Sequence, residues 1–297
     1  MIHKLIHYWH KRLSNNQKLR LGMTLLVKNE ADIIAENIEF HSKQGVDCFT
    51  IMDNGSTDGT REILDTFKNK VDLLIIDQPD QSYQQAKWMT QLAFIARDKQ
   101  KVDLVVSNDA DEFWLAHSGN LKNHLFMRDS VVTIPRYNMA LSTNATAKNY
   151  QFSDSNLVVK NPILFDKQTQ INDPAIAMML IKISPQTIVN PYGLWRLKGG
   201  NHRAKHAWNL INSRFEHEIN VYHYPIRSFE QFENNIKNRA RLLSSTPAKM
   251  GDHYRRWVKL YEQGRLQEEF DRFLLSESDI STLVKIGVLH QFNPFKN

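Results

Sequence analysis

The feature that most constrains the fold is a regular alternation of short apolar runs and longer helical segments, which starts at residue 21. The apolar runs have the length and the Leu, Ile and Val content of buried strands. They cover residues 21–27, 48–53, 71–77, 102–107 and 131–135, and the helical segments between the first four of them cover 29–45, 61–69 and 82–98. The alternation predicts an α/β fold with a mixed, mostly parallel sheet that is entered through helical crossovers.

The alternation fades after residue 137. Residues 138–175 are rich in Asn, Ser, Thr and Asp, which is typical of loops and short antiparallel strands. Residues 178–184 and 219–225 have the apolar pattern of further strands, and the chain turns helical from residue 228. We therefore predict one domain over residues 21–225 and a helical C-terminal appendage over 226–297.

The excess positive charge lies at the N-terminus. The net charge is +6, and residues 1–29 hold six Lys and Arg residues and no Asp or Glu, so the remainder is balanced. Apolar residues at helical spacing predict a basic amphipathic helix over residues 1–20. Such a helix either lies on an anionic membrane surface or docks on its own domain. The balanced remainder argues against a nucleic-acid partner.

Composition sets the expected compartment. The 297 residues are 41% hydrophobic, and the sequence has neither an apolar run of membrane-spanning length nor the pattern of a signal peptide. Its single cysteine, Cys48, lies in an apolar segment and is expected to be buried filler rather than a nucleophile. We predict a cytoplasmic protein, peripheral at the inner face of the cell membrane if the N-terminal helix binds lipid.

Polar residues follow three of the predicted strands at the point where each strand ends. In parallel α/β sheets, ligands bind at the carboxyl ends of the strands, and neighbouring ends converge on one rim. The pattern predicts a site for a nucleotide with a metal-bound diphosphate. The residues are Lys28, Asn29 and Glu30 after the first strand, Asp53, Asn54 and Ser56 after the second, and Asp109, Asp111 and Glu112 after the fourth.

The pair Asp109 and Asp111 is the strongest metal signal. Alternate residues of an extended chain point to the same side, so two carboxylates at this spacing can share one Mg²⁺ or Mn²⁺. In the alternative, both residues cap a following helix. Residues 113–120 do not start a convincing helix, which favours the metal.

Three ordered motifs carry a resemblance to a known family. They are LLVKNEADIIAENIEFHSKQGVDCFTIMDNGSTDGT, LVVSNDADEFW and HYPIRSFEQFENNIKNR. Together they resemble the family 2-like glycosyltransferases of bacteria, in the branch whose metal motif reads Asp-Ala-Asp-Glu-Phe, over roughly residues 21–240. The resemblance implies a GT-A fold, a Rossmann-like nucleotide-diphospho-sugar transferase domain. Its nucleotide-sugar half is then 21–137 and its acceptor half 138–225.

The resemblance implies roles for the residues at the strand ends. Asp53 contacts the nucleotide, with Asn54 and Ser56 in the loop beside it. Lys28, Asn29 and Glu30 border the same nucleotide. Asp109 and Asp111 hold the metal and the diphosphate, and Glu112 orients them.

The second half of the chain supplies further candidates by the same resemblance. His202 or His223 is a third metal ligand, with His202 favoured because glycines precede it, although either can be structural. Arg227 meets phosphate oxygens. On the helix over 82–98, Lys87 lies near the base and ribose, and the helix is otherwise a core helix.

The function that follows is a metal-dependent, inverting glycosyltransferase. It moves a sugar from a UDP- or GDP-linked donor to a glycan or lipid-linked acceptor, in the synthesis of bacterial surface polysaccharide or lipopolysaccharide. The catalytic base stays unassigned among Asp166, Asp173, Glu216 and Glu218.

Two other functions remain open. A nucleotidyltransferase also places metal-binding carboxylates at strand ends, but the Gly-rich phosphate loop that it usually has after the first strand is replaced here by Lys-Asn-Glu. A non-catalytic nucleotide-sugar-binding protein would retain the same residues without the reaction.

Overall fold

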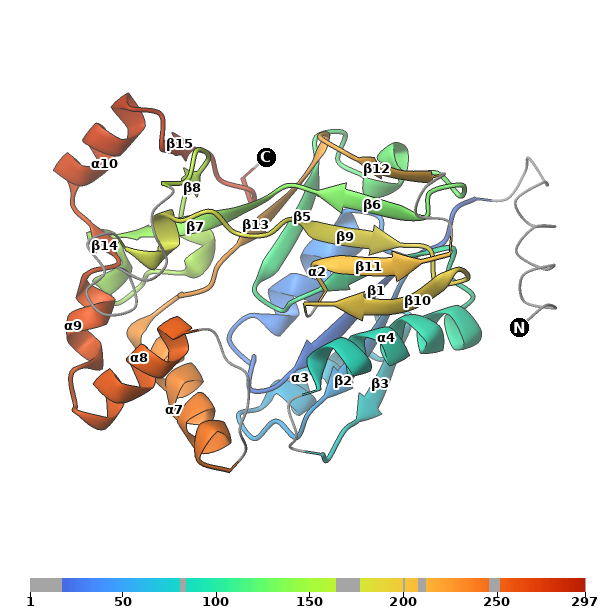
Figure 1. Cartoon of the computed structure of the whole chain (residues 1–297), viewed down its shortest axis with the longest axis horizontal. Coiled ribbons are helices and arrows are strands. Elements are labelled where there is room, and N and C mark those ends of the chain that lie inside the picture. Colours follow the sequence, from blue (N-terminus) through green and yellow to red (C-terminus); the bar gives the residue numbers. More distant parts are fainter. Residues whose placement is uncertain are drawn as a thin grey trace. The chain divides into compact units, whose positions relative to one another are not determined.

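The computed structural model describes residues 18–80, 84–163, 177–199, 201–207, 212–245 and 252–296. The chain divides into two compact units, each made of two segments (Figure 1). Unit 1 comprises the chain up to Arg136 and Ser184–Val221, and unit 2 comprises Tyr137–Ile183 and the chain from Tyr222. The predicted helix over residues 1–20 falls almost entirely outside the described residues.

Unit 1 is built on a seven-stranded sheet of order β12-β6-β9-β4-β1-β2-β3. The run β4-β1-β2-β3 is parallel, and β9 is antiparallel to both of its neighbours. The predicted α/β architecture with a mostly parallel sheet is confirmed. The strands are β1 (Leu21–Val27), β2 (Cys48–Asp53), β3 (Leu73–Asp77), β4 (Leu104–Asn108), β6 (Val131–Ile134), β9 (Gln186–Val189) and β12 (Ser213–Phe215).

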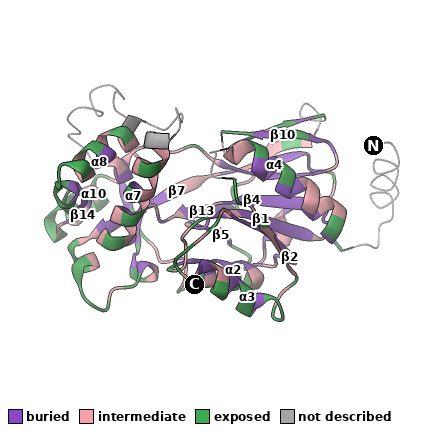
Figure 2. Ribbon diagram, turned by 90° about the horizontal axis from the view of Figure 1, so that it is seen from below, coloured by how far each residue is buried: buried purple, intermediate pink, exposed green. Residues whose placement is uncertain are grey.

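Helices cover both faces of this sheet. Figure 2 shows the strands β1, β2 and β4 coloured as buried, with α4 on one side of them and α2 and α3 on the other. The helices are α2 (Ile34–Lys43), α3 (Thr60–Phe67) and α4 (Gln85–Ile95). Cys48 lies in the core between β2 and α4, and burial raises the pKa of its thiol to about 12, as expected of an inert filler.

Two further strands and a hairpin complete unit 1. β5 (Glu112–Ala116) follows β4 after a short turn. The strands β10 (Leu194–Lys198) and β11 (Arg203–His206) form an antiparallel hairpin, and Leu194 and Leu197 pack in the same core cluster as α4. β13 (Ile219–His223) begins in unit 1 and ends in unit 2.

A buried histidine anchors α2 to β5. The backbone N–H of Trp114 donates to His41 Nε2 at 3.0 Å, so Nδ1 carries the proton and donates to the Asn37 carbonyl oxygen at 2.7 Å. The Asn37 side chain donates in turn to the carbonyl oxygens of Ala110 (2.8 Å) and Glu112 (3.0 Å). These bonds fix the chain segment between β4 and β5 against α2.

Unit 2 combines short strands with the C-terminal helices. β8 pairs antiparallel with β7 and β15, and β14 pairs parallel with β7. Aromatic side chains of α7, α8 and α9 form the core with the strands. The elements are β7 (Arg136–Ser142), β8 (Leu157–Val159), α7 (Phe229–Ser245), α8 (Asp252–Glu262), α9 (Leu266–Asp271), β14 (Leu274–Leu275), α10 (Glu277–Lys285) and β15 (Leu289–Gln291).

One predicted strand is wrong. Residues 178–184 form the 3₁₀ turn η5 (Met178–Leu180) and a loop, and the strand of this region is β9, which starts at Gln186. The apolar side chains of Met179 and Leu180 are buried in unit 2. The apolar pattern of this segment therefore indicates burial, although the segment is not a strand. Among the described residues, none of the helices combines the length and the apolar character that a membrane crossing needs.

We expect His41 to make the protein sensitive to acid. Burial lowers the pKa of His41 from 6.5 to about 3, so between these values the unfolded chain binds a proton that the folded chain does not. Stability should therefore fall as the pH drops below 6.5, by up to about 1.4 kcal/mol per pH unit from this group. Urea unfolding at pH 7 and pH 5 should show a smaller pH dependence in His41→Gln than in the wild type.

The exposed His290 of β15 provides the control. His290→Gln should keep the wild-type pH dependence. An unchanged slope in His41→Gln would contradict the assignment of acid sensitivity to His41.

Candidate functional site

The Asp-x-Asp motif lies in a tight turn at the carboxyl end of β4. The N–H of Glu112 donates to the Asp109 carbonyl oxygen at 3.1 Å, which places Ala110 and Asp111 at the two central positions of the turn. The expected extended geometry is therefore wrong. The helix-cap alternative is wrong as well, because residues 112–116 form the strand β5.

Asp109 lies in an excess of negative charge. Burial raises the pKa of its carboxyl well above the usual range, and the neighbouring carboxylates of Glu112 and Asp111 raise it further. The guanidinium of Arg136 and a hydrogen bond from Asn201 act in the opposite direction. A second amide, Gln85 Nε2, lies 3.4 Å from Asp109 Oδ1. Three carboxylates thus face one guanidinium, an arrangement that a bound cation would stabilise.

Glu112 is fully buried and held through both carboxylate oxygens. It forms an ion pair with Arg136, and Gln186 Nε2 donates to Glu112 Oε1 at 2.7 Å and Oε2 at 2.6 Å. Its backbone carbonyl accepts from the side chains of Asn37 and Asn108. Glu112 is therefore committed to internal contacts and fixes the turn in place.

The residues of the turn fit a hard divalent cation. No group of three or more His, Cys, Asp or Glu side chains in the described part of the chain forms a complete protein metal site. With Glu112 committed, Asp109 and Asp111 remain as carboxylate ligands, which leaves most of the coordination shell for ligand phosphates and water. Mg²⁺ and Mn²⁺ bound with nucleotides are commonly held in this way.

Buried polar atoms around the turn also lack partners. Four such atoms form no hydrogen bond with any residue that the structure describes: Ser107 Oγ, Arg136 Nε, Gln186 Oε1 and Asn201 Oδ1. An unsatisfied buried polar group costs about 1–3 kcal/mol. Arg136 and Gln186 bind Glu112, and Asn201 Nδ2 donates to the Ser107 carbonyl oxygen at 3.3 Å, so all four atoms belong to the surroundings of the turn.

The loops after β1 and β2 lie at the same edge of the sheet as the turn. β1 pairs with both β2 and β4, and Val27 is opposite Asp53 while Leu25 is opposite Asn108. The expectation that these three strand ends lie side by side is confirmed.

Hydrogen bonds join the two loops. The N–H of Asn29 donates to Ser56 Oγ at 3.0 Å, and the N–H of Thr57 donates to Asn29 Oδ1 at 2.8 Å. Asn29 has φ +57°, in the left-handed region that Asn adopts more readily than most residues. Glu30 follows the same pattern, since its N–H donates to Thr60 Oγ1 at 2.8 Å, and Lys28 is exposed beside them.

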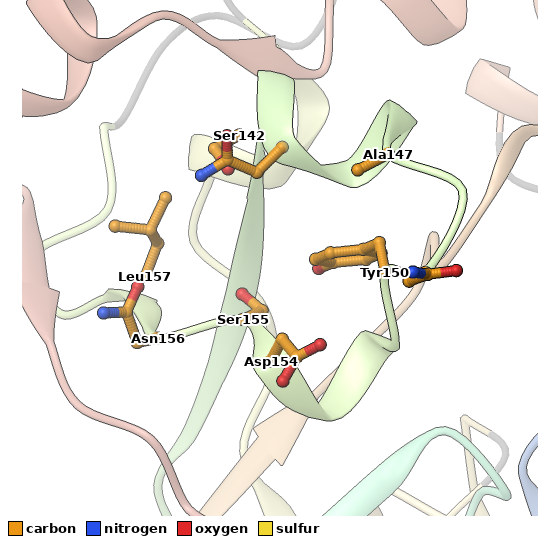
Figure 3. Close-up of a pocket in the computed structure, with 9 residues that line it drawn as sticks. Ser142, Ala147, Tyr150, Asp154, Ser155, Asn156 and Leu157 are labelled. Carbon is orange, nitrogen blue, oxygen red and sulfur yellow. The ribbon is translucent and has the colours of Figure 1, made fainter.

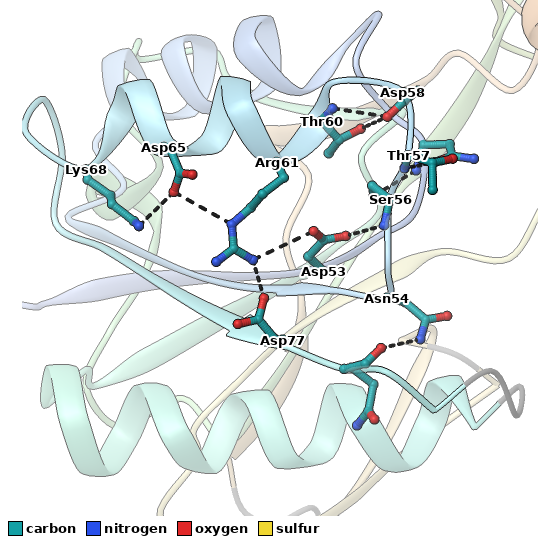
Figure 4. Close-up of polar contacts among 12 residues, drawn as sticks. Asp53, Asn54, Ser56, Thr57, Asp58, Thr60, Arg61, Asp65, Lys68 and Asp77 are labelled. Atoms are coloured by element: carbon teal, nitrogen blue, oxygen red, sulfur yellow. Dashed lines mark hydrogen bonds and ion pairs between the residues drawn. The ribbon is translucent and has the colours of Figure 1, made fainter.

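Asp53 already has partners on both carboxylate oxygens (Figure 4). Oδ1 accepts from the N–H of Ser56 at 2.9 Å, and Oδ2 lies 3.8 Å from Arg61, which also pairs with Asp77. The hydrogen bond to Asp77 raises the pKa of Arg61. The Asn54 side chain donates to the carbonyl oxygens of residues 78 and 80. Any nucleotide contact of Asp53 therefore takes place beside the Arg61 guanidinium.

The helix α4 contributes a residue that sequence reasoning passed over. Lys87, to which it assigned the nucleotide contact, donates to Gln84 Oε1 at 3.1 Å on the surface. Gln85, two positions earlier, instead reaches Asp109. In the sequence, the position of Gln85 at the start of the helix after β3 is the feature that points to this contact.

The candidates from the second half of the chain are divided between the units. His202 follows Asn201 in the turn of the β10–β11 hairpin in unit 1. His223 and Arg227 belong to unit 2, where His223 Nδ1 lies 2.8 Å from Asn138 Oδ1 and the buried Arg227 contacts Tyr224 and Gln231.

Two of the four candidate bases lie beside basic side chains. Glu216 pairs with Arg214 at 2.6 Å, and Glu218 lies 3.4 Å from His117. Asp166 and Asp173 fall outside the described residues.

Unit 2 holds a polar pocket of about 350 Å³ (Figure 3). Tyr150 forms one wall, and burial raises the pKa of its hydroxyl to about 12. Ser155 lies beside it and donates to the Ala140 carbonyl oxygen at 2.9 Å. The pocket contains none of the predicted site residues. Its lining is Ser142, Asn144, Ala147, Asn149, Tyr150, Asp154, Ser155, Asn156 and Leu157.

Comparison with known proteins identifies a family. The family model described as glycosyltransferase family 92 matches residues 23–192, which include the turn and the loops after β1 and β2. No curated protein sequence matches the chain.

Solved structures of TarS from S. aureus are similar in part. The crystal structure of TarS 1–349 is 14% identical over 86% of this chain and 71% of that chain, with a TM-score of 0.43. Its complex with UDP-GlcNAc is 14% identical over 86% and 72%, with a TM-score of 0.44. The complex with UDP is 13% identical over 85% and 72%, with a TM-score of 0.40.

We expect Asp109→Asn to stabilise the protein. The pKa of the Asp109 carboxyl is raised on folding, so its ionised form is disfavoured in the folded state at pH 7, and stability should recover as the pH falls toward the unfolded value near 4. Removing the charge should therefore raise the free energy of unfolding at pH 7 and reduce its dependence on pH between pH 7 and pH 4. Urea unfolding at pH 7 and pH 4 measures both values.

Asp271→Asn, which removes an exposed carboxylate of unit 2, is the matched control and should have little effect. A loss of stability in Asp109→Asn at pH 7 would show that the carboxylate of Asp109 stabilises the fold.

Proposed function

The chain belongs to glycosyltransferase family 92, and on that premise we propose that it is a metal-dependent glycosyltransferase of the GT-A type. It moves a sugar from a nucleotide-sugar donor to a glycan or lipid-linked acceptor. The observation that carries this proposal is the Asp109–Glu112 turn, where three carboxylates face one guanidinium at the carboxyl edge of a parallel sheet. Such an edge is where α/β sheets bind nucleotides.

The donor is proposed to lie across the ends of β4, β1 and β2. Asp109 and Asp111 would hold Mg²⁺ or Mn²⁺, which when bound neutralises the diphosphate as it leaves. Gln85 and Asn201 bind the Asp109 carboxylate and hold it in position. The loop residues Lys28, Asn29, Glu30, Asp53, Asn54 and Ser56 border the nucleotide, which is UDP or GDP.

Catalysis depends on the charge that develops on the leaving group. In an inverting transfer, the acceptor oxygen attacks the anomeric carbon, its proton passes to a base, and the bond to the diphosphate breaks. The buried Arg136 and Glu112 hold the turn rigid, so its carboxylates need no reorganisation as the reaction proceeds. Surface polysaccharide or lipopolysaccharide is the proposed product.

The membership in family 92 favours this function over a nucleotidyltransferase. A non-catalytic nucleotide-sugar-binding protein is distinguished by experiment, because it would bind the donor without releasing the nucleotide.

We expect diphosphate binding to require both a metal and Asp111. Calorimetric titration of UDP, GDP and UMP with and without Mn²⁺ should show tight binding of one diphosphate only when the metal is present. Asp111→Ala removes one of the two carboxylate ligands and should weaken that binding by at least about tenfold, or 1.4 kcal/mol.

Asp271→Ala serves as the control and should bind as the wild type does. Diphosphate binding that is the same with and without Mn²⁺, or the same in Asp111→Ala, would overturn the proposed metal site.

A further inference from the structure

The β10–β11 hairpin presents four cations on one face. In its register Arg196 is opposite Lys205, and Lys198 is opposite Arg203. Directly opposed residues of antiparallel strands share a face, and all four side chains are exposed. The intervening pair, Leu197 and Ala204, packs against the core that contains α4. Because side chains alternate along a strand, the four cations lie on the solvent face.

This arrangement is unfavourable for the hairpin itself. Like charges opposite each other destabilise an antiparallel pair. None of the four cations forms an ion pair with a carboxylate in the described part of the chain. A ladder of two like-charge pairs that keeps its charges exposed is therefore suited to an anionic partner.

An exposed indole accompanies the cations. Trp195 lies at the register shift between Leu194 and Arg196 and is 59% exposed. Lys205 Nζ lies 4.7 Å from the centroid of its ring. An aromatic ring beside fixed cations provides an apolar face for a sugar ring and positive charge for the anionic groups of the same molecule.

The turn of the hairpin leads into the candidate site. It carries Asn201, which binds the carboxylate of Asp109 and the Ser107 carbonyl oxygen. Lys198 and Arg203 form the inner pair, next to this turn. Arg196 and Lys205 form the outer pair, about 7 Å farther along the strands.

We propose that the solvent face of this hairpin binds an anionic glycan, phosphate- or carboxylate-bearing, as the acceptor of the transferase. This inference rests on the proposed function and specifies its acceptor class. An anionic bilayer is the less suitable partner, since Trp195 is the one large exposed apolar side chain on the described residues of the hairpin.

The outer pair provides the test, because it lies away from the turn. Labelled dextran, phosphorylated dextran and carboxymethyl dextran of equal length are titrated by fluorescence anisotropy at one ionic strength. The wild type should bind one or both anionic dextrans and not dextran. Arg196→Gln/Lys205→Gln should weaken that binding by about tenfold and leave the affinity for the diphosphate that the wild type binds, UDP or GDP, within about twofold.

A matched double variant, Lys43→Gln/Lys70→Gln, removes the same charge from exposed positions of unit 1 and should bind as the wild type does. Trp195→Leu keeps all four cations and should weaken binding by about threefold if the indole contributes a stacking contact. The outer-pair variant should unfold at the same or a higher temperature than the wild type, because a like-charge pair is removed.

Equal anionic-dextran affinity in the outer-pair variant and the wild type would overturn the proposal. The proposal would also be overturned if the outer-pair variant lost binding to phosphatidylglycerol vesicles alone and kept its affinity for the anionic dextrans. That result would assign the face to a bilayer. If neither UDP nor GDP binds any form in the presence of Mn²⁺ while anionic-dextran binding still depends on the outer pair, the proposed function fails and the anionic-glycan surface stands.

Discussion

The buried ion pair between Glu112 and Arg136 is the interaction on which the candidate site depends. Gln186 binds both oxygens of the same carboxylate, and Asn37 and Asn108 bind the backbone carbonyl of Glu112. Contacts from β9, α2 and β4 therefore converge on the last residue of the turn. Removing one partner of a buried ion pair leaves the other charge uncompensated, so these contacts depend on one another.

The same set of contacts leaves the Asp109 carboxylate in electrostatically unfavourable surroundings. Glu112 is held beside it and raises the pKa of the Asp109 carboxyl although it is paired with Arg136, and Asp111 adds a third carboxylate. Gln85 and Asn201 orient the Asp109 carboxylate with neutral amides and contribute no positive charge. Three carboxylates thus lie near the single guanidinium of Arg136, an arrangement that a bound cation would stabilise. Local electrostatic repulsion that lowers the stability of the fold is typical of binding and catalytic sites.

The sequence predicts the framework well because the framework follows from local patterns. The bounds of β1 and β2 agree with the predicted 21–27 and 48–53, since each is an unbroken apolar run that ends in polar residues. The parallel pairing of β4, β1 and β2 agrees with the predicted helical crossovers. The turn at Asp109 and the role of Gln85 depend on distant partners such as Asn37 and Asn201, to which no local pattern points.

The cationic face of the β10–β11 hairpin also could not be predicted from the sequence. Its residues alternate irregularly because Trp195 lies at a register shift, so the period of two that marks a strand is interrupted. The cations then appear in the sequence as scattered Lys and Arg, and only the register places Arg196 opposite Lys205. These opposed cations repel each other and do not stabilise the fold. They lie on the hairpin whose turn carries Asn201, which binds Asp109. A negative turn suited to a cation and a positive hairpin suited to an anion are thereby joined through Asn201.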